Sequence, residues 1–383
     1  MVFGSFCFLP HNEGVGMNPR NHDFIVIFFL GVVVSSMACQ SVISSGRDAA
    51  PTESPLPAQA SSQAPTPSPD IGTFCSDQED IHRTTDRFSF PSPLVGYSIV
   101  HPDEAVIRTE DGGLTWKVVS TVTGRINDVF FINPQIGWVA GDSGLILKTE
   151  DGGTHWQLLD SRAPIKLNVV QFIDEKTGWV GGINNVILHT TDGGATWSTS
   201  VIIQKHGFNV TDLSFLDRQN GYLSGSGGPF GYVMRTADGG ATWENKFEVT
   251  VPNGIFATPD GVVWIAGGWV SYSIWKAEGD TAKEVFSHTP QVQSHLYDIY
   301  FSTSQHGWAF GTCGVYATQD GGMQWEKMDL RLESWAYFVT MRFFGSQEAV
   351  LVGPGGEETI YVLHSSDGGG SWTGSHSSIC DIS

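Results

Sequence analysis

Basic residues are scarce in this sequence. Its 383 residues include 20 Lys and Arg against 40 Asp and Glu, which gives a formal net charge of −20. Sequence-independent binding to a phosphate backbone needs Lys and Arg to displace counterions, and docking on anionic lipid needs a basic surface. The composition therefore argues against a nucleic-acid partner and against electrostatic membrane binding, and it favours a cationic or neutral partner.

Long apolar segments are also scarce. The one long apolar run, Phe24–Val34, is too short to span a bilayer comfortably and has the length of a signal-peptide core. Arg20 supplies a basic flank, and Met17 is an alternative start of the chain. We therefore expect residues 1–38 to form an export signal.

The residues after this run resemble a bacterial lipoprotein processing site, with Cys39 as the lipidated residue. Ordinary cleavage after Ala38 is the alternative. The following stretch, 40–70, is rich in Ser, Pro, Ala and Thr and cannot bury enough apolar surface to fold. We expect residues 39–74 to be a lipidated cysteine and an extended tether, so that the protein is exported and anchored to the cell membrane by lipid, facing the periplasm or the cell exterior.

Turn sequences of the form Asp-Gly-Gly-x-x-Trp recur through the rest of the chain. A degenerate copy, Lys276-Ala277-Glu278-Gly279-Asp280, lies in the double-length gap between the fourth and fifth clear copies. Seven units at a period near 40 residues predict a propeller or a solenoid. The aspartates are Asp111, Asp151, Asp192, Asp238, Asp320 and Asp367, and the tryptophans are Trp116, Trp156, Trp197, Trp243, Trp325 and Trp372.

Each unit contains four short β-rich runs separated by turn residues, as in DVFFIN, GWVAGD, GLILKTEDGG and THWQLL of the second unit. Such a unit cannot bury both faces alone and must stack on its neighbours. We predict an all-β, seven-bladed β-propeller with four-stranded antiparallel blades as one domain over residues 75–383. The predicted blades lie near 86–120, 125–160, 166–200, 207–248, 252–287, 294–329 and 335–373.

The repeated turn is an Asp box, and its chemistry is local. The carboxylate can accept hydrogen bonds from N–H groups of its own turn, and the glycines permit positive φ. A carboxylate that recurs in every hairpin is therefore expected to be structural and not catalytic.

The clearest copy of the whole pattern runs from Phe131 through Gly137-Trp138 and the Asp151 box to Trp156. This pattern resembles the photosystem II stability/assembly factor family of propellers over roughly residues 86–373. The resemblance implies a protein without enzymatic activity or cofactor that assists the assembly or stability of a membrane complex. It implies a protein or membrane-complex partner, and we expect the propeller to be a monomer.

Asp boxes also occur in sialidases and xyloglucan-cleaving hydrolases, so a carbohydrate-binding or glycoside-hydrolase-like propeller is the alternative. A sialidase needs three arginines on one carboxylate, and only Arg87, Arg125 and Arg342 lie in or beside a first strand. No pairing of a Tyr with a Glu can be recognised. The sequence also lacks a phosphate-binding loop and a Ser-His-Asp spacing. Since it contains no Cys/His set with metal-ligand spacing, we expect no metal site.

The candidate binding face is the mouth of the predicted channel, where Arg87, Asp128, Asp212, His295 and Asp298 fall at or beside the start of first strands. One interpretation is an acidic mouth that holds a cation or a basic partner. The other is a set of solvated loop-edge acids. In a narrow channel, the three aspartates could also supply the pair of carboxylates that a hydrolase needs.

One column of basic residues precedes the Asp boxes: Arg108, Lys148, His189, Arg235, Lys276 and His364, with Ala317 as the exception. These side chains either balance the acidic turns at little net energy or form a basic rim that contacts a partner.

Cys75 precedes the first blade and Cys380 follows the last, so a disulfide between them would close the ring. Exported proteins keep such bonds, and a loop of this length predicts ~4–5 kcal/mol as an upper guide in the entropy model. Cys313, in a predicted loop on the same face, is the rival partner.

Overall fold

The computed structural model describes residues 87–202, 207–227, 230–268, 271–290, 294–330, 337–355 and 359–378. The expected export signal, the tether, Cys39, Cys75 and Cys380 lie outside these residues. Within the described part, no helix is long and apolar enough to cross a membrane.

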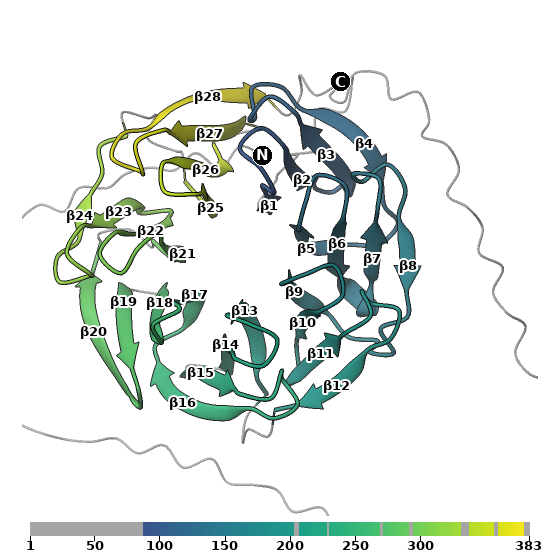
Figure 1. Ribbon diagram of the computed structural model, residues 1–383, viewed down its shortest axis with the longest axis horizontal. Coiled ribbons are helices and arrows are strands. Elements are labelled where there is room, and N and C mark those ends of the chain that lie inside the picture. Colours follow the sequence, from purple (N-terminus) through teal and green to yellow (C-terminus); the bar gives the residue numbers. More distant parts are fainter. Residues whose placement is uncertain are drawn as a thin grey trace, which may run out of the picture. The chain divides into compact units, whose positions relative to one another are not determined.

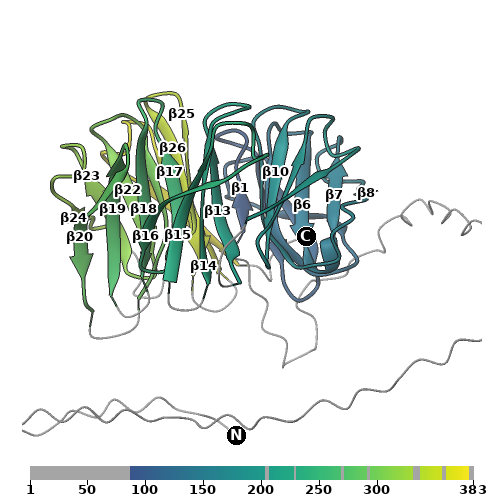
Figure 2. The same cartoon turned by 90° about the horizontal axis from the view of Figure 1, so that it is seen from below.

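Seven four-stranded antiparallel sheets are arranged around a common axis, and each sheet uses four consecutive strands (Figures 1 and 2). The first strand of each sheet lies next to the axis and the fourth lies at the rim. The predicted fold, a seven-bladed propeller with four-stranded blades, is confirmed.

The first four blades are built from β1 (Phe88–Ser89), β2 (Gly96–Val100), β3 (Ala105–Thr109) and β4 (Lys117–Thr121); β5 (Ile126–Phe131), β6 (Gly137–Gly141), β7 (Ile146–Thr149) and β8 (Gln157–Leu159); β9 (Leu167–Phe172), β10 (Gly178–Gly182), β11 (Val186–Thr190) and β12 (Ser198–Val201); and β13 (Asn209–Phe215), β14 (Gly221–Gly227), β15 (Phe230–Thr236) and β16 (Glu244–Val249). A short 3-10 turn, η1 (Asp142–Gly144), joins β6 to β7.

The last three blades are built from β17 (Pro252–Ala257), β18 (Val262–Gly268), β19 (Tyr272–Glu278) and β20 (Thr281–His288); β21 (Leu296–Phe301), β22 (Gly307–Gly311), β23 (Gly314–Thr318) and β24 (Glu326–Lys327); and β25 (Thr340–Phe344), β26 (Glu348–Pro354), β27 (Thr359–Ser365) and β28 (Thr373–Ser378). The seventh blade therefore extends five residues beyond the predicted limit at 373. The sixth has an outer strand of only two residues.

Four of the second strands, β2, β6, β10 and β22, are buried along their whole length. They lie in the middle of each sheet, with a neighbouring blade on either face, and this explains why their sequences are small or apolar throughout. The rim strands are mostly exposed, and the sheet edge there carries charged and polar side chains.

Aromatic rings join neighbouring blades in a repeated arrangement. The Tyr97 ring of the first blade stacks on Phe131 of the second, with centroids 3.5 Å apart. The other side of Phe131 lies on Gly137, where a Cβ atom would come within 2.5 Å of the ring. Trp156 then meets Phe131 edge-on at 6.1 Å. The glycine of the Gly-Trp pair is thus required because its own blade's aromatic ring occupies the space of a side chain.

The same arrangement recurs between other blades. Trp138 stacks on Phe172 at 3.6 Å, and Trp179 stacks on Phe215 at 3.4 Å. Both indole N–H groups are buried and donate to the next Asp box, Trp138 to the Gly193 carbonyl and Trp179 to the Gly239 carbonyl. The Gly-Trp motif therefore binds the second and third blades to the Asp-box turns of the blades that follow them.

The ring closes between the seventh and first blades without a shared sheet. A core cluster that includes Phe88, Trp116, Val352 and Val362 packs across this boundary. His364 also bonds the Gly112 carbonyl through Nε2 at 2.6 Å. These apolar contacts and hydrogen bonds hold the ring closed within the described residues.

We expect Phe215→Ala to lower the free energy of unfolding by about 3–5 kcal/mol, because it leaves a cavity under the stacked Trp179 ring. Leu216→Ala is the matched control, since Leu216 is the next residue and is exposed, so a change within about 0.5 kcal/mol is expected. Chemical denaturation measures both. Equal effects of the two substitutions would contradict the importance of the inter-blade stack.

Candidate functional site

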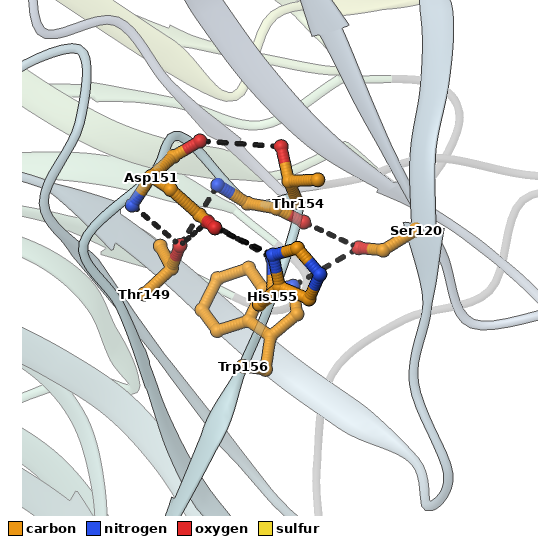
Figure 3. Close-up of polar contacts among 7 residues, drawn as sticks. Ser120, Thr149, Asp151, Thr154, His155 and Trp156 are labelled. Carbon is orange, nitrogen blue, oxygen red and sulfur yellow. Dashed lines mark hydrogen bonds and ion pairs between the residues drawn. The ribbon is translucent and has the colours of Figure 1, made fainter. Parts of the chain in front are cut away.

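The Asp boxes are closed networks of hydrogen bonds, as Figure 3 shows for the second blade. The Thr149 hydroxyl donates to Asp151 Oδ1 at 2.9 Å and accepts the Gly153 N–H. The His155 N–H donates to the same oxygen, and the His155 ring bonds Oδ2 at 2.7 Å. Trp156 donates its indole N–H to Ser120 of the preceding blade.

Hydrogen bonds to the box carboxylates favour their ionised form. The Thr196 hydroxyl and N–H lower the pKa of Asp192 to about 2, and the Ser371 hydroxyl and N–H lower the pKa of Asp367 to about 2. A group that stays ionised and donates no proton at neutral pH is poorly suited to general acid catalysis.

The fifth blade lacks this network. Its hairpin is a two-residue turn, Gly279-Asp280, between Glu278 and Thr281. Asp280 instead pairs with Lys246 of the fourth blade at 2.9 Å. This copy has therefore exchanged an internal box for an ion pair between blades.

The three predicted channel-mouth acids lie on the inner strands, and two of them bond the backbone of the following blade. Asp128 accepts the Val170 N–H and Asp212 accepts the Ile255 N–H, both at 2.8 Å. Asp298 accepts the N–H of Ile299 and packs against Gly254 of the preceding blade.

Other inner-strand side chains make the same kind of inter-blade bond. Inner strands have one edge without a sheet partner, and their N–H and C=O groups need other partners there. Some of these side chains donate to backbone carbonyls of the next blade: Arg87 to Asn127, Asn127 to Leu167, Asn168 to Val210, Thr211 to Pro252 and Asn253 to Leu296. The acceptors of N–H groups include Ser89, Gln171 and Ser214.

Burial raises the pKa of Asp212 to about 7, even though the N–H groups of Ile255 and Leu213 oppose the shift. The Asp128 carboxylate adds to the increase and Arg87 reduces it. Burial, followed by the charge of Asp212, also holds the pKa of Asp298 well above its usual range. Asp128 and Arg87 therefore lie close enough to Asp212 to influence its ionisation.

These inner residues do not form a metal centre. Among the residues that the structure describes, no group of three or more His, Cys, Asp or Glu is placed to hold a metal ion. His295 lies before β21, where its ring bonds the Gly268 carbonyl at 3.1 Å. The sequence indicated that these residues share the inner face. It did not indicate that hydrogen bonds between blades use much of their hydrogen-bonding capacity.

Cys313 lies between β22 and β23 and is a free, buried thiol. Its Sγ approaches the His295 carbonyl at 3.6 Å, and burial raises its pKa to about 12. The thiol is therefore protonated and weakly nucleophilic at neutral pH.

The basic column has an internal role that sequence reasoning missed. Arg108 lies over the Tyr97 ring and Lys148 over the Trp138 ring, each 5.7 Å from the centroid, and Lys276 lies 5.3 Å from the centroid of Trp264. His189 stacks on Trp179 at 5.1 Å. The cross-strand register produces these pairs, since each basic residue faces the aromatic residue of the second strand.

Two surface clefts are large enough for part of a ligand. One, of about 710 Å³, is lined by 123–125, 142–145 and 158–164 of the second blade and the connection that follows it. The other, of about 730 Å³, lies on the Asp-box face between the sixth and seventh blades and is lined by Trp308, Ala317 and both Asp boxes, among others.

Large apolar side chains are exposed at five described positions, and all five are aliphatic. Four lie in turns between strands one and two or in Asp boxes, which share one face of the ring: Leu94, Leu114, Leu216 and Met323. The fifth, Leu158, lies on a rim strand. Aromatic side chains in the described part are in contrast buried or half-buried.

We expect Asp212→Asn to change how stability depends on pH. The folded-state pKa of Asp212 is raised to about 7, so the unfolded chain binds fewer protons between about pH 4 and 7, and wild-type stability falls as pH rises through this range. The asparagine variant should lose this part of the decrease. Thermal unfolding from pH 4.5 to 8.5 measures it, and parallel profiles of the two proteins would contradict it.

The family model described as photosynthesis system II assembly factor YCF48 matches residues 116–207 and 277–377, which together make up half of the chain. Among curated proteins, none matches the sequence significantly.

Solved structures share the fold. A structure of YCF48 bound to D1 peptide is 22% identical, with a TM-score of 0.57, over 79% of this chain and 99% of that one. YCF48 from Cyanidioschyzon merolae is 19% identical, with a TM-score of 0.57, over 76% of this chain and 98% of that one. The GH74 xyloglucanase from Xanthomonas campestris is 13% identical, with a TM-score of 0.57; the match covers 74% of this chain and 52% of the xyloglucanase. At these identities the likenesses show the fold alone, whereas the family model shows that the chain belongs to the photosynthesis system II assembly factor YCF48 family.

Proposed function

We propose that this protein is a non-enzymatic, exported scaffold that binds a segment of a protein partner on its Asp-box face and assists the assembly or stability of a membrane complex. The observation that carries the proposal is the distribution of exposed apolar side chains. Four of the five lie on that one face, so apolar contact with another protein is more favourable there than on the opposite face.

A carbohydrate-binding role is less well supported. Sugars pack on exposed aromatic rings, and the described aromatic residues are instead used in contacts within and between blades. The inner carboxylates, which a hydrolase would need free, accept backbone N–H groups at Val170 and Ile255. Hydrolase activity would need these bonds to be given up.

Family membership supports a role in assembly. The YCF48 structure bound to D1 peptide shows that a propeller of this fold can hold a peptide. The likeness supports the same fold for this chain, but it does not identify the partner of this chain.

The proposed location rests on the sequence alone. The Phe24–Val34 run, Cys39 and the polar stretch to residue 70 support an exported chain with a lipid anchor and a tether. We expect the full chain to sediment with membranes and Cys39→Ala to release it. Fractionation of cells that express each form measures this, and equal soluble fractions would contradict the anchor.

Binding to peptides and glycans discriminates the two functions. We expect the full chain to select peptides from a random linear library with saturable micromolar affinity, and to bind neither xyloglucan oligosaccharides nor sialosides. Leu114→Asp and Leu158→Asp form a matched pair, since both leucines are exposed but only Leu114 lies on the Asp-box face. Only Leu114→Asp should weaken peptide binding. Glycan binding or turnover without peptide selection would overturn the proposal.

A further inference from the structure

The sixth blade differs from the first, second and fifth blades beside the cleft that it shares with the seventh. In the first, second and fifth blades, a Lys or Arg lies over the second-strand aromatic ring and pairs with a glutamate two residues on. In the sixth blade, Ala317 faces Trp308 in the same register, and Gln319 replaces the glutamate. This blade therefore lacks both the cation and its acidic partner.

The Asp box of this blade is also incomplete. In the other five boxes, Oδ2 of the aspartate bonds the side chain of the residue four positions on: Thr115, His155, Thr196, Thr242 or Ser371. Gln324 takes this position in the sixth box and donates only its backbone N–H, to Oδ1 of Asp320. Within the described residues, Oδ2 of Asp320 thus has no partner.

Among the described residues, Trp308 also lacks a hydrogen-bond partner that its counterparts in other blades have. Trp138 and Trp179 donate to carbonyls of the next box, but the indole N–H of Trp308 is buried without a partner in the described part of the chain. Its ring is tilted by 32° against Phe343 at 4.8 Å, whereas the other two stacks are within 8° of parallel. The Trp308 side chain is 3% exposed and lines the cleft.

These differences lie together. Trp308, Ala317, Asp320 and Gln324 all line the 730 Å³ cleft, and Met323, which is 77% exposed, lies between two of them in sequence. Glu326 and Asp367 add two carboxylates to the lining, against one lysine, Lys327. Backbone N–H groups, that of Gln324 first, lower the pKa of Asp320, which is therefore ionised at neutral pH.

We propose that this cleft receives a Lys or Arg side chain of the partner, over Trp308, in the place that the chain's own cations occupy in other blades. The inference rests on the proposed protein-binding function and names the chemistry that the site recognises. The cation lies over the indole and pairs with Asp320 Oδ2. A carbonyl of the same segment can accept the Trp308 N–H. The chain's excess of acidic residues favours the encounter.

The test uses 5-fluorotryptophan-labelled full chain, in which each of the 13 tryptophans carries a ¹⁹F label, with the Trp308 resonance assigned from Trp308→Phe. The probes are Nα-acetyl-arginine methylamide and its neutral isostere, Nα-acetyl-citrulline methylamide. We expect a saturable shift of the Trp308 resonance with the arginine derivative, weakened by salt, and none with citrulline. An equal response to citrulline, or no response to either, overturns the inference.

Substitutions at position 317 give the matched controls. The double substitution Ala317→Lys with Gln319→Glu gives the sixth blade the internal ion pair that the second blade has. We expect it to raise Tm and to weaken binding of the arginine derivative roughly tenfold. Ala317→Ser adds no cation and should leave binding unchanged. Undiminished binding by the folded double variant overturns the inference.

A xyloglucan oligosaccharide is a further probe. If it shifts the Trp308 resonance and the arginine derivative does not, the cleft binds a sugar and the inference is overturned. The library separates this failure from that of the proposed function. If selected peptides bind wild type and the double variant equally, the protein-binding function stands and the cation site is wrong. If no peptide binds, the function is wrong, and the arginine titration still decides whether the cleft holds a cation.

Discussion

The contact on which this fold most depends is the aromatic stack between neighbouring blades. An aromatic ring of one blade lies flat on a ring of the next blade, with centroids 3.4 to 3.6 Å apart in the three closest cases. A glycine of that next blade lies against the other side of its ring. Close-packed apolar contact of this kind accounts for most of the favourable free energy of folding. The repeat needs both residues at fixed spacing because neither ring is buried without its neighbour.

The inner strands face a second constraint, since each has one edge that no strand covers. The chain satisfies that edge with side chains from the preceding blade, including Asp128 and Asp212. This requirement places half-buried carboxylates on the inner strands, and the pKa of Asp212 rises there to about 7. Acids near the axis of a propeller can thus be structural, and their presence alone does not indicate catalysis.

Departures from the repeat are more informative about function than the repeat itself. The basic column balances aromatic faces and acidic turns inside the first, second and fifth blades. Where Ala317 interrupts the column, a cleft is lined by a buried tryptophan and ionised carboxylates. A site formed by removing one side chain from a repeated arrangement needs no new loop, and the rest of the ring keeps it rigid.

The number of blades, their four-stranded pattern and their approximate limits could be predicted from the sequence, because the Asp-box period and the Gly-Trp or Gly-Tyr pairs are local signals that most blades repeat. The sequence also showed Ala317 as the exception in the basic column. What these residues contact became clear only from the folded structure. Asp212 bonds Ile255, 43 residues away, and the cleft joins Trp308 to the box of Asp367. Such contacts depend on how one blade lies against the next, and no local pattern within a blade specifies that packing.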